Sequence, residues 1–285
     1  MIEIHLLEAL AAFYQYGTLS AAAQYLHISQ PALSRSMKRL EEILNVSLFT
    51  RTKNSITLND TGILAAQLAQ DILNSENRMI QMVRYYDSSL HTISIGSAAP
   101  GPIMEIPSLM TQLYPDMSIT CETENEKVLL QGLEDQKYNI IILSHPMDLP
   151  NIVCLPYSTE SLYVSIPSDH PLKKFKDTGV TFKDIDGNTF LQISYVGVWD
   201  EIKKKMLPNS KILRQSDRET LNALENASSL LSFVTDVSLR SIRERNNPNR
   251  LLIPIKDPEA TVQFYCLMRK DKRLDSFIQY LQTNI

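Results

Sequence analysis

The sequence predicts a chain of three parts: a small, mainly α-helical N-terminal domain with a two-stranded wing, one long connecting helix, and a larger α/β domain with two lobes. Three observations predict this organisation. Apolar residues recur at helical spacing in the first 58 residues, a proline-free heptad pattern follows, and short apolar strands alternate with helices after residue 91. The length of 285 residues also suggests two or more domains.

The first predicted helix carries an apolar face made of Leu6, Leu7, Leu10, Phe13 and Tyr14. Gly17 is its expected C-cap, because glycine adopts the left-handed conformation that ends many helices. Ser20 is expected to cap a second, short helix, in which the alanines of 21–23 allow close helix approach.

A third helix is predicted to start at Ser29, whose hydroxyl can accept a hydrogen bond from a free backbone N–H. Pro31 fits the first turn, where a missing N–H costs nothing. An apolar stripe follows, made of Leu33, Met37, Leu40 and Leu44. Ser34, Arg35 and Lys38 point away from this stripe. The helix can therefore pack on its neighbours and still present polar and cationic side chains to a DNA major groove.

Residues 49–58 alternate in the way expected of a two-stranded wing with a polar tip, where Arg51 and Lys53 suit contact with phosphates or the minor groove. From 29 to 53 the chain has five cations and two anions, although its total net charge is −4. A focused cationic patch on an acidic protein favours sequence-selective DNA binding over non-specific polyanion binding.

The connecting helix is predicted over residues 58–86, which contain no proline and one glycine near the start. Seven of nine residues at heptad spacing are apolar in the set Leu58, Thr61, Ala65, Leu68, Ile72, Ser75, Met79, Met82 and Tyr86. Such a seam is typical of a coiled coil and predicts a homodimer. The alternative is a helix packed on its own domain. A helix of about 40 Å is too long for the small domain to cover, which favours the dimer.

After residue 91 the pattern changes to alternating strands and helices. Strands predicted at 92–96, 117–122 and 139–143 alternate with helices at 102–114 and 125–136, which predicts a parallel α/β sheet. A second unit has predicted strands at 161–166, 189–193, 230–234 and 263–268 and predicted helices at 198–206, 218–226 and 274–281.

Composition and motifs argue against several other classes. No apolar run is long enough for a membrane span and no signal peptide is apparent, so we expect a cytoplasmic protein. Cys121, Cys154 and Cys266 are odd in number and scattered, which favours reduced core thiols over disulfides or a peroxide-sensing pair. No nucleotide-binding, hydrolase or metalloprotease motif is present, and the histidines lack metal-ligand spacing. We therefore expect neither an enzyme nor a bound cofactor or metal.

A specific set of residues recurs at fixed spacing in the first 62 residues: Ala21, Ala22, Leu26, the run Ser29-Gln30-Pro31-Ala32-Leu33-Ser34, Leu40, Glu41, the run Leu48-Phe49-Thr50-Arg51, Leu58, Thr61 and Gly62. With this set the chain resembles the LysR-type transcriptional regulators. The remaining residues match that family in layout more than in sequence.

The resemblance implies a winged helix-turn-helix DNA-binding domain over 1–58, a linker and dimerisation helix over 59–90, and an effector-binding domain over 91–285. The last domain is expected to be two-lobed α/β and to resemble periplasmic binding proteins. Lobe I is expected at about 91–160 and 266–285, and lobe II at about 161–265.

Nine residues are predicted to contact DNA. Ser29 lies at the start of the helix, and the candidates for contact with base edges are Gln30, Pro31, Ser34 and Arg35. The candidates for phosphate contact are Lys38, Arg51, Thr52 and Lys53. Arg39 lies to one side of this face, where a solvated position or an intrahelical pair with Glu41 or Glu42 is expected instead.

Ten residues are predicted to line an effector cleft at the strand ends: Ser97, Ala98, Ala99, Pro100, Gly101, Ser144, His145, Gln192, Ser194 and Thr235. Residues 97–101 precede a helix whose free N–H groups favour an anion, so we expect a small anionic metabolite. The alternative for each residue is an ordinary turn. The run 228–230, Ser-Ser-Leu, replaces the family's usual glycine-bearing turn and leaves the shape of the cleft on the lobe II side open.

The predicted function is a sequence-specific transcriptional regulator whose promoter binding or activation is changed by that metabolite. The alternative is a ligand-binding module that no longer reads DNA, against which Arg35, Lys38, Arg51 and Lys53 argue. Expected partners are double-stranded promoter DNA, the effector and a second copy through the linker helix. The resemblance to the family further implies assembly into a homotetramer and RNA polymerase as a candidate partner.

Overall fold

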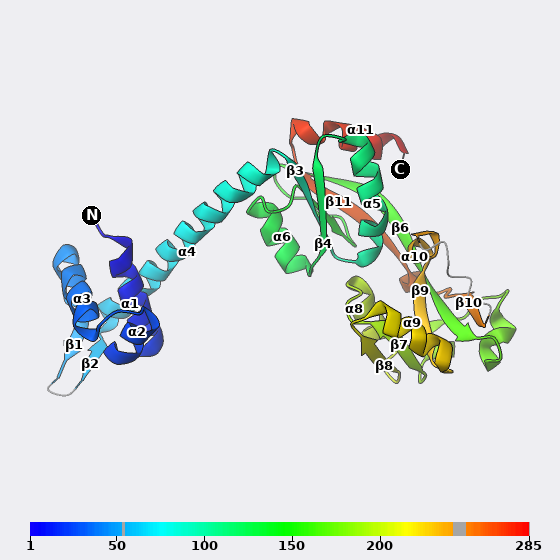
Figure 1. Ribbon diagram of the computed structural model, residues 1–285, viewed down its shortest axis with the longest axis horizontal. Helices are drawn as coiled ribbons and strands as arrows, with labels where there is room; N and C mark the ends of the chain where they lie inside the picture. Colours follow the sequence, from blue (N-terminus) through cyan, green and yellow to red (C-terminus); the bar gives the residue numbers. More distant parts are fainter. Residues whose placement is uncertain (53–54, 242–248, 285) are drawn as a thin grey trace. The chain divides into compact units, whose positions relative to one another are not determined.

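The computed structural model describes residues 1–52, 55–241 and 249–284. The chain divides into two compact units, Met1–Arg84 and Tyr85–Ile285, which are described separately (Figure 1). None of the described helices is both long enough and apolar enough to cross a membrane.

The first unit contains three short helices and a wing: α1 (Ile4–Tyr16), α2 (Leu19–Tyr25), α3 (Gln30–Leu44), β1 (Phe49–Arg51) and β2 (Ile56–Leu58). The predicted caps at Gly17 and Ser29 are confirmed. Gly17 ends α1 with φ 73°, and the Ser29 hydroxyl accepts a hydrogen bond from Ala32 N–H at 3.3 Å. The two strands pair antiparallel, which confirms the predicted wing.

Three local predictions in this unit are wrong. Tyr14, predicted to share the apolar face of the first helix, is exposed and not among the buried residues of α1. The N-cap of α2 is Thr18 rather than Ser20, because α2 starts at Leu19 and the Thr18 hydroxyl accepts from Ala21 N–H at 3.2 Å. Leu44 does not continue the buried stripe of α3. The helix ends there, with Asn45 in the left-handed conformation, and the Leu44 side chain is exposed.

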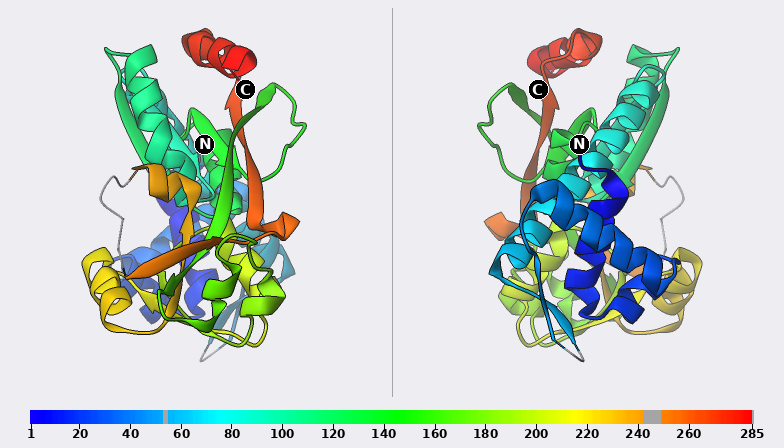
Figure 2. Two further views of the ribbon diagram at one scale, coloured as in Figure 1. Left: turned by 90° about the vertical axis from the view of Figure 1, so that its right-hand side faces the viewer. Right: turned by 90° about the vertical axis from the view of Figure 1, so that its left-hand side faces the viewer.

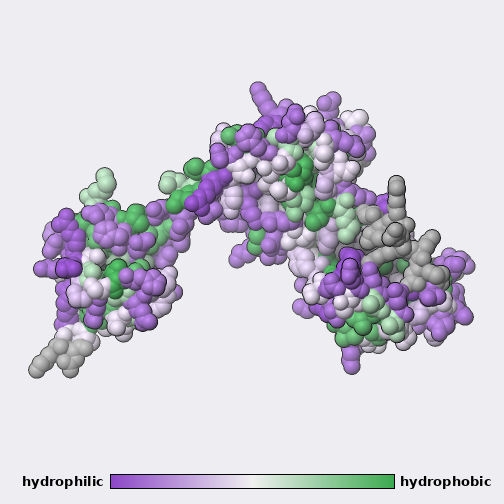
Figure 3. Space-filling model, in the orientation of Figure 1, coloured by the Kyte–Doolittle hydropathy of each residue, from purple (hydrophilic) through white to green (hydrophobic). Residues whose placement is uncertain are grey.

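Helix α4 (Asp60–Ser89) begins against the first unit. The Asn59 side chain accepts from Gly62 N–H at 2.8 Å, and a Cβ on Gly62 would overlap the Leu48 carbonyl, so only glycine fits this close approach. Ala66 and Ala69 are buried in the core of this unit. The opposite side of these turns and the rest of α4 carry exposed apolar side chains: Leu64, Leu68, Ile72, Met79, Val83 and Tyr86 (Figure 3). The first turns therefore pack on their own domain, whereas the exposed stripe is free for another partner.

The second unit contains β3 (Thr92–Ser97), α5 (Pro100–Leu113), β4 (Ser118–Thr123), α6 (Glu126–Glu134), β5 (Ile140–Leu143), β6 (Ile152–Pro167), η1 (Pro171–Phe175), α7 (Phe182–Ile185), β7 (Thr189–Ile193), α8 (Val198–Met206), β8 (Lys211–Gln215), α9 (Arg218–Ala227), β9 (Leu231–Thr235), α10 (Asp236–Ser241), β10 (Arg250–Pro254), η2 (Pro258–Ala260), β11 (Thr261–Arg269), η3 (Lys272–Leu274) and α11 (Asp275–Asn284).

The strands of this unit form one sheet in the order β4-β3-β5-β11-β6-β9-β7-β8, with β10 beside β6. The strands β3, β4 and β5 are parallel, as predicted. We call the part around β3, β4 and β5 lobe I and the part around β7, β8 and β9 lobe II. The long antiparallel strands β6 and β11 run side by side, and β6 continues from lobe I into lobe II (Figure 2).

The prediction of a strand that starts at residue 161 is too short. Strand β6 starts at Ile152 and passes through the expected lobe boundary at 160 and 161. Its first part pairs with β11, and its later part pairs with β9 and β10. The sequence analysis did not predict strands β8 and β10. The polar, mostly exposed residues of the edge strand β8 give no apolar run to detect.

Candidate nucleic-acid interface and interlobe cleft

The exposed face of α3 brings together most of the residues predicted to contact DNA. Ser29, Gln30, Pro31, Ser34, Arg35 and Lys38 are all exposed. Leu33, Met37 and Leu40, on the opposite side of the helix, are buried against the rest of the first unit. Burial of this apolar stripe fixes the helix so that two cations and several short polar side chains share one surface.

The wing adds Arg51 and Thr52, which are exposed, while Lys53 lies outside the described residues. Arg51 Nη2 lies 2.7 Å from Glu41 Oε2. Glu41 therefore pairs with the wing, and Arg39 is exposed, in agreement with the solvated alternative. Thr52 Oγ1 forms a 2.7 Å hydrogen bond with Ser55 Oγ.

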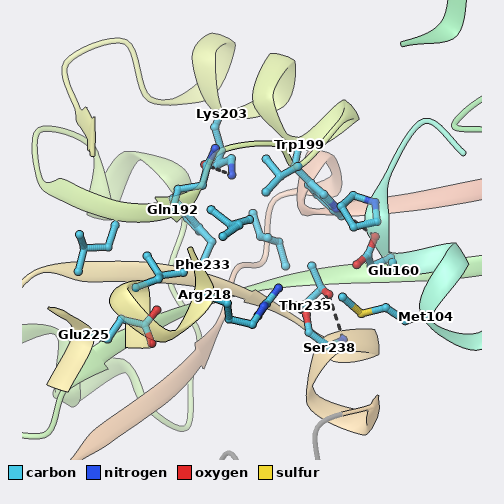
Figure 4. A pocket seen from close by; sticks show the side chains of 17 residues that line it. Met104, Glu160, Gln192, Trp199, Lys203, Arg218, Glu225, Phe233, Thr235 and Ser238 are labelled. Carbon is cyan, nitrogen blue, oxygen red and sulfur yellow. Dashed lines mark hydrogen bonds between the residues drawn. The ribbon is translucent and has the colours of Figure 1, made fainter. Parts of the chain in front are cut away.

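A cavity of about 90 Å³ lies between lobes I and II (Figure 4). Its lining residues are Pro100, Gly101, Met104, Glu160, Leu162, Leu191, Gln192, Ile193, Val196, Trp199, Lys203, Arg218, Leu221, Glu225, Phe233, Thr235 and Ser238. Four residues of the predicted effector set are among them: Pro100, Gly101, Gln192 and Thr235. The cavity thus has an apolar body with a few ionisable and polar groups, as is typical of small-molecule sites.

The other six residues of the predicted set lie outside this lining: Ser97, Ala98, Ala99, Ser144, His145 and Ser194. The Ser97 hydroxyl donates to the Ala99 carbonyl at 2.7 Å. His145 Nε2 lies 3.5 Å from Glu126 Oε1 on lobe I. The backbone N–H of Ser194 donates to the Gln215 carbonyl at 2.8 Å, so several of these residues have local structural partners.

Glu160 is the carboxyl group on the lobe I side of the cleft, and sequence analysis did not select it. It lies on β6 and is 2% exposed. Trp199 Nε1–H donates to Glu160 Oε2 at 3.0 Å. Burial raises the pKa of Glu160, and the nearby carboxylates Asp236 and Glu105 act in the same direction, against hydrogen bonds from Thr235 and Trp199.

Glu160 also changes the expectation for the start of α5. Gly101 lies in its first turn, and a Cβ there would overlap the Glu160 carboxyl. Pro100 and Pro102 remove two of the free N–H groups that an anion would need. The chain's own carboxyl therefore occupies the region where the sequence suggested an external anion.

Lys203 is the buried base on the lobe II side of the cleft. It lies on α8, is 3% exposed, and donates a hydrogen bond to Gln192 Oε1. Its Nζ lies 4.9 Å from the centre of the Phe233 ring. Burial lowers the pKa of Lys203 to about 7, against the attraction of Asp200. Gln192 in turn donates to Asp200 at 2.8 Å, and Asp200 pairs with Arg214 at 3.0 Å.

The two lobes are joined directly at one edge of the cleft. The backbone N–H of Val198 at the start of α8 donates to the Ala98 carbonyl of lobe I at 3.1 Å. The preceding residue, Gly197, has φ 61°, and a Cβ there would overlap the Ala98 carbonyl oxygen. Arg240 of α10 pairs with Glu105 of α5 at 3.1 Å. These contacts hold lobe II against the start of α5.

The cysteines do not form a redox pair in the structure. Burial raises the pKa of Cys121 and raises that of Cys266 strongly, which disfavours the reactive thiolate. Cys154 and Cys266 lie on paired strands, where their side chains belong to different hydrophobic clusters on the two sheet faces. Within the described residues, no group of three or more potential ligands could hold a metal ion.

Comparison with known proteins matches both parts of the chain to described families. Residues 4–63 match the profile of bacterial regulatory helix-turn-helix proteins of the lysR family, and residues 90–284 match the LysR substrate binding domain. BenM of Acinetobacter baylyi, an HTH-type transcriptional regulator, is 26% identical over 278 residues, covering 94% of this chain and 90% of BenM. With two other curated relatives the match spans only 53% and 54% of their length.

Two solved structures share the fold. Full-length CbnR complexed with its target DNA aligns with a TM-score of 0.51 at 23% identity, covering 98% of this chain and 99% of CbnR. The BenM effector binding domain with its effector benzoate aligns with a TM-score of 0.52 at 22% identity, covering 67% of this chain and 90% of that domain.

Proposed function

The chain belongs to the LysR family of bacterial regulatory helix-turn-helix proteins, and from this we propose that it is a DNA-binding transcriptional regulator controlled by a small metabolite. The observation that carries the proposal is the exposed cationic and polar face of α3 above a fully buried apolar stripe. Such a helix fits a major groove, and CbnR, which has the same fold, was solved with its target DNA. Because its proposed partner is promoter DNA, we expect the protein to act in the cytoplasm.

Within this interface, Arg35 is the strongest candidate for a base contact, because guanidinium groups pair with guanine edges in two places. Lys38 is assigned to a phosphate, as are Thr52 and Lys53 of the wing. Arg51 reaches the same surface but is already paired with Glu41, so it contributes less positive charge to a phosphate than a free arginine would.

The test is binding of the purified protein to DNA fragments from the promoter region next to its own gene. Arg35→Ala and Lys38→Ala should each weaken binding, and Lys38→Ala should reduce the salt slope by about one. Arg39→Ala is the matched control, because Arg39 is also exposed on α3 but lies to one side of the reading face. Binding unchanged in the double variant would favour the alternative, a ligand-binding module that no longer reads DNA.

The second copy needed for paired half-sites is proposed to dock on α4. Its exposed apolar stripe extends beyond the turns that pack on the first unit. An isolated stripe of this size facing water is unfavourable, and a second α4 would bury it. From membership of this family we also propose that the protein forms a homotetramer and contacts RNA polymerase.

The cleft between the lobes is proposed to bind the metabolite, and its carboxylate is proposed to lie near Lys203 and Arg218 of lobe II. BenM, a relative, was solved with the carboxylate benzoate. A ligand that contacts both lobes favours one lobe arrangement over another, and couplings of this kind typically amount to about 1–3 kcal/mol. We infer no catalysis, because the cleft residues have hydrogen-bonding and packing roles and no nucleophile–base pair is apparent among the described lining residues.

A further inference from the structure

Two buried ionisable side chains of opposite sign face the cleft, and neither has an ionic partner among the described residues. They are Glu160 from β6 and Lys203 from α8. Figure 4 shows Lys203 at the upper left of the cavity and Glu160 at its right, with Trp199 of α8 between them. An isolated buried charge is costly unless it is paired, so this arrangement needs a physical explanation.

Glu160 has hydrogen-bond donors but no cationic partner in the part of the chain that the structure describes. Trp199 Nε1–H bonds one carboxyl oxygen, and the Thr235 hydroxyl is a further donor. The charged groups that act on Glu160 are the carboxylates Asp236 and Glu105, which disfavour its ionised form. A cationic group of a ligand beside Glu160 would offset these effects and pair with the ionised carboxylate.

Lys203 has an acceptor but no carboxylate within ion-pair distance in the described part of the chain. Its Nζ is bonded to the neutral amide oxygen of Gln192, while the nearest acid, Asp200, is already engaged by Gln192 and Arg214. The face of Phe233 gives weak support to a cation at 4.9 Å. An entering carboxylate would supply the missing partner.

We propose that the cleft ligand is a small amino acid or a similar zwitterion, whose ammonium group binds Glu160 and whose carboxylate binds Lys203. This inference rests on the proposed function, which requires a cleft metabolite, and it narrows the chemical class of that metabolite. The other two charged lining residues, Arg218 and Glu225, have opposite signs, so together they do not change the net charge of the lining.

Ligands with one charge fit the cleft less well. A plain carboxylate would pair with Lys203 but bring a second negative group beside Glu160, and a plain amine would leave Lys203 without a partner. The zwitterion satisfies both sides at once. The cavity of about 90 Å³ also favours a ligand of few atoms, with its carbon chain against Met104, Leu162 and Phe233.

The experiment compares matched ligands on the full-length protein. The probes are the twenty proteinogenic L-amino acids, β-alanine and γ-aminobutyrate. Thermal shift identifies the compounds that stabilise the protein, and titration calorimetry gives their affinity. For each such compound, the analogue without the amino group and the analogue without the carboxyl group are measured under the same conditions. We expect both analogues to bind about tenfold or more weakly than the parent zwitterion.

Variants identify the two contacts. Glu160→Gln should weaken binding of the amino acid about tenfold or more and leave binding of its des-amino carboxylate unchanged or stronger. Lys203→Met should weaken both. Glu219→Gln, an exposed glutamate of α9 outside the lining, is the matched control and should change neither. The comparison of ligands on the wild type needs no variant, so a variant that fails to fold does not remove the test.

Two results would overturn the inference. One is a des-amino carboxylate that binds the wild type as tightly as its amino acid. The other is no stabilisation by any zwitterion of the panel. Promoter binding measured without any ligand tests the proposed DNA-binding function separately, so the two failures are distinguishable.

Discussion

Arg51 of the wing donates a hydrogen bond to Glu41 of α3, with 2.7 Å between Arg51 Nη2 and Glu41 Oε2. The other oxygen of Glu41 accepts from Leu48 N–H at 2.8 Å and from Phe49 N–H at 3.3 Å. One half-buried carboxylate therefore connects the end of α3 to the start of the wing through hydrogen bonds. The relative placement of α3 and the wing depends on this side chain.

Glu41→Gln is expected to destabilise the first unit by about 1–3 kcal/mol, because a charge-assisted bond is lost and buried N–H groups are left with a weaker acceptor. Urea denaturation followed by circular dichroism measures the loss. Glu42→Gln, at an exposed neighbouring position, is the control.

The same carboxylate has a pH signature. Burial alone would raise the pKa of Glu41, but hydrogen bonds from Leu48 N–H and Arg51 outweigh it and lower the pKa. Its stabilisation is therefore present above the ordinary carboxyl range and is lost as pH falls through the lowered pKa. The difference in stability between wild type and Glu41→Gln should shrink below about pH 4. An equal difference at pH 7 and pH 3 would contradict this role.

Lys203→Met is expected to change how stability depends on alkaline pH. Burial lowers the pKa of Lys203 to about 7, whereas an unfolded lysine titrates near 10.4. Between these values the unfolded chain binds the extra proton, so the contribution of Lys203 to stability rises with pH, by up to about 1.4 kcal/mol per unit. The variant lacks this rise. Its stability relative to wild type should be greater at pH 7 than at pH 9, in chemical denaturation of the ligand-free protein.

The control for Lys203 is Lys204→Met, because Lys204 is the next residue on α8 and is exposed. If the two variants differed from wild type by the same amount at both pH values, Lys203 would not be a buried base with a depressed pKa.

Gly197→Ala is expected to weaken the direct contact between the lobes. At φ 61° and ψ −130° the backbone favours glycine, and the added Cβ would overlap the Ala98 carbonyl oxygen. The variant should lose about 1–3 kcal/mol more stability than Gly187→Ala, which also has a positive φ but open space around its Cβ. Equal losses in thermal denaturation would mean that the contact with Ala98 is unimportant.

Met79→Glu is expected to shift a dimer of the full-length protein toward the monomer, because a charge would enter the apolar stripe of α4. Met79 is exposed and belongs to that stripe. Sedimentation equilibrium over a range of concentrations measures the change. Gln81→Glu, an exposed polar position on the same helix, is the matched control, and a dimer equally stable in both variants would show that the stripe is not the interface.

The sequence was sufficient to predict helix α3 and the wing. Ser29, Pro31 and the stripe of Leu33, Met37 and Leu40 are signals that act within a few residues, and α3 shows each of them in its predicted role. The start of α2 was predicted wrongly, because Thr18 and Ser20 are both capable caps and packing of the short helix selects between them.

The cleft was only partly predictable. Pro100, Gly101, Gln192 and Thr235 follow the rule that sites form at strand ends, and all four line the cavity. Glu160 lies inside the long strand β6 and Lys203 inside a lysine-rich helix, where an ionisable residue is normally solvated. No local signal distinguishes these two residues from surface charges.

The sequence by itself determined α3 with its cap Ser29 and its buried stripe, the wing and the family, because each depends on residues a few positions apart. Only the tertiary structure decided that Glu160 and Lys203 are buried on either side of one cavity and that Glu41 is paired with Arg51. Burial and pairing of charges are set by segments distant in the chain that the fold brings together, and the free energy of a charge depends on those surroundings more than on its neighbours in sequence.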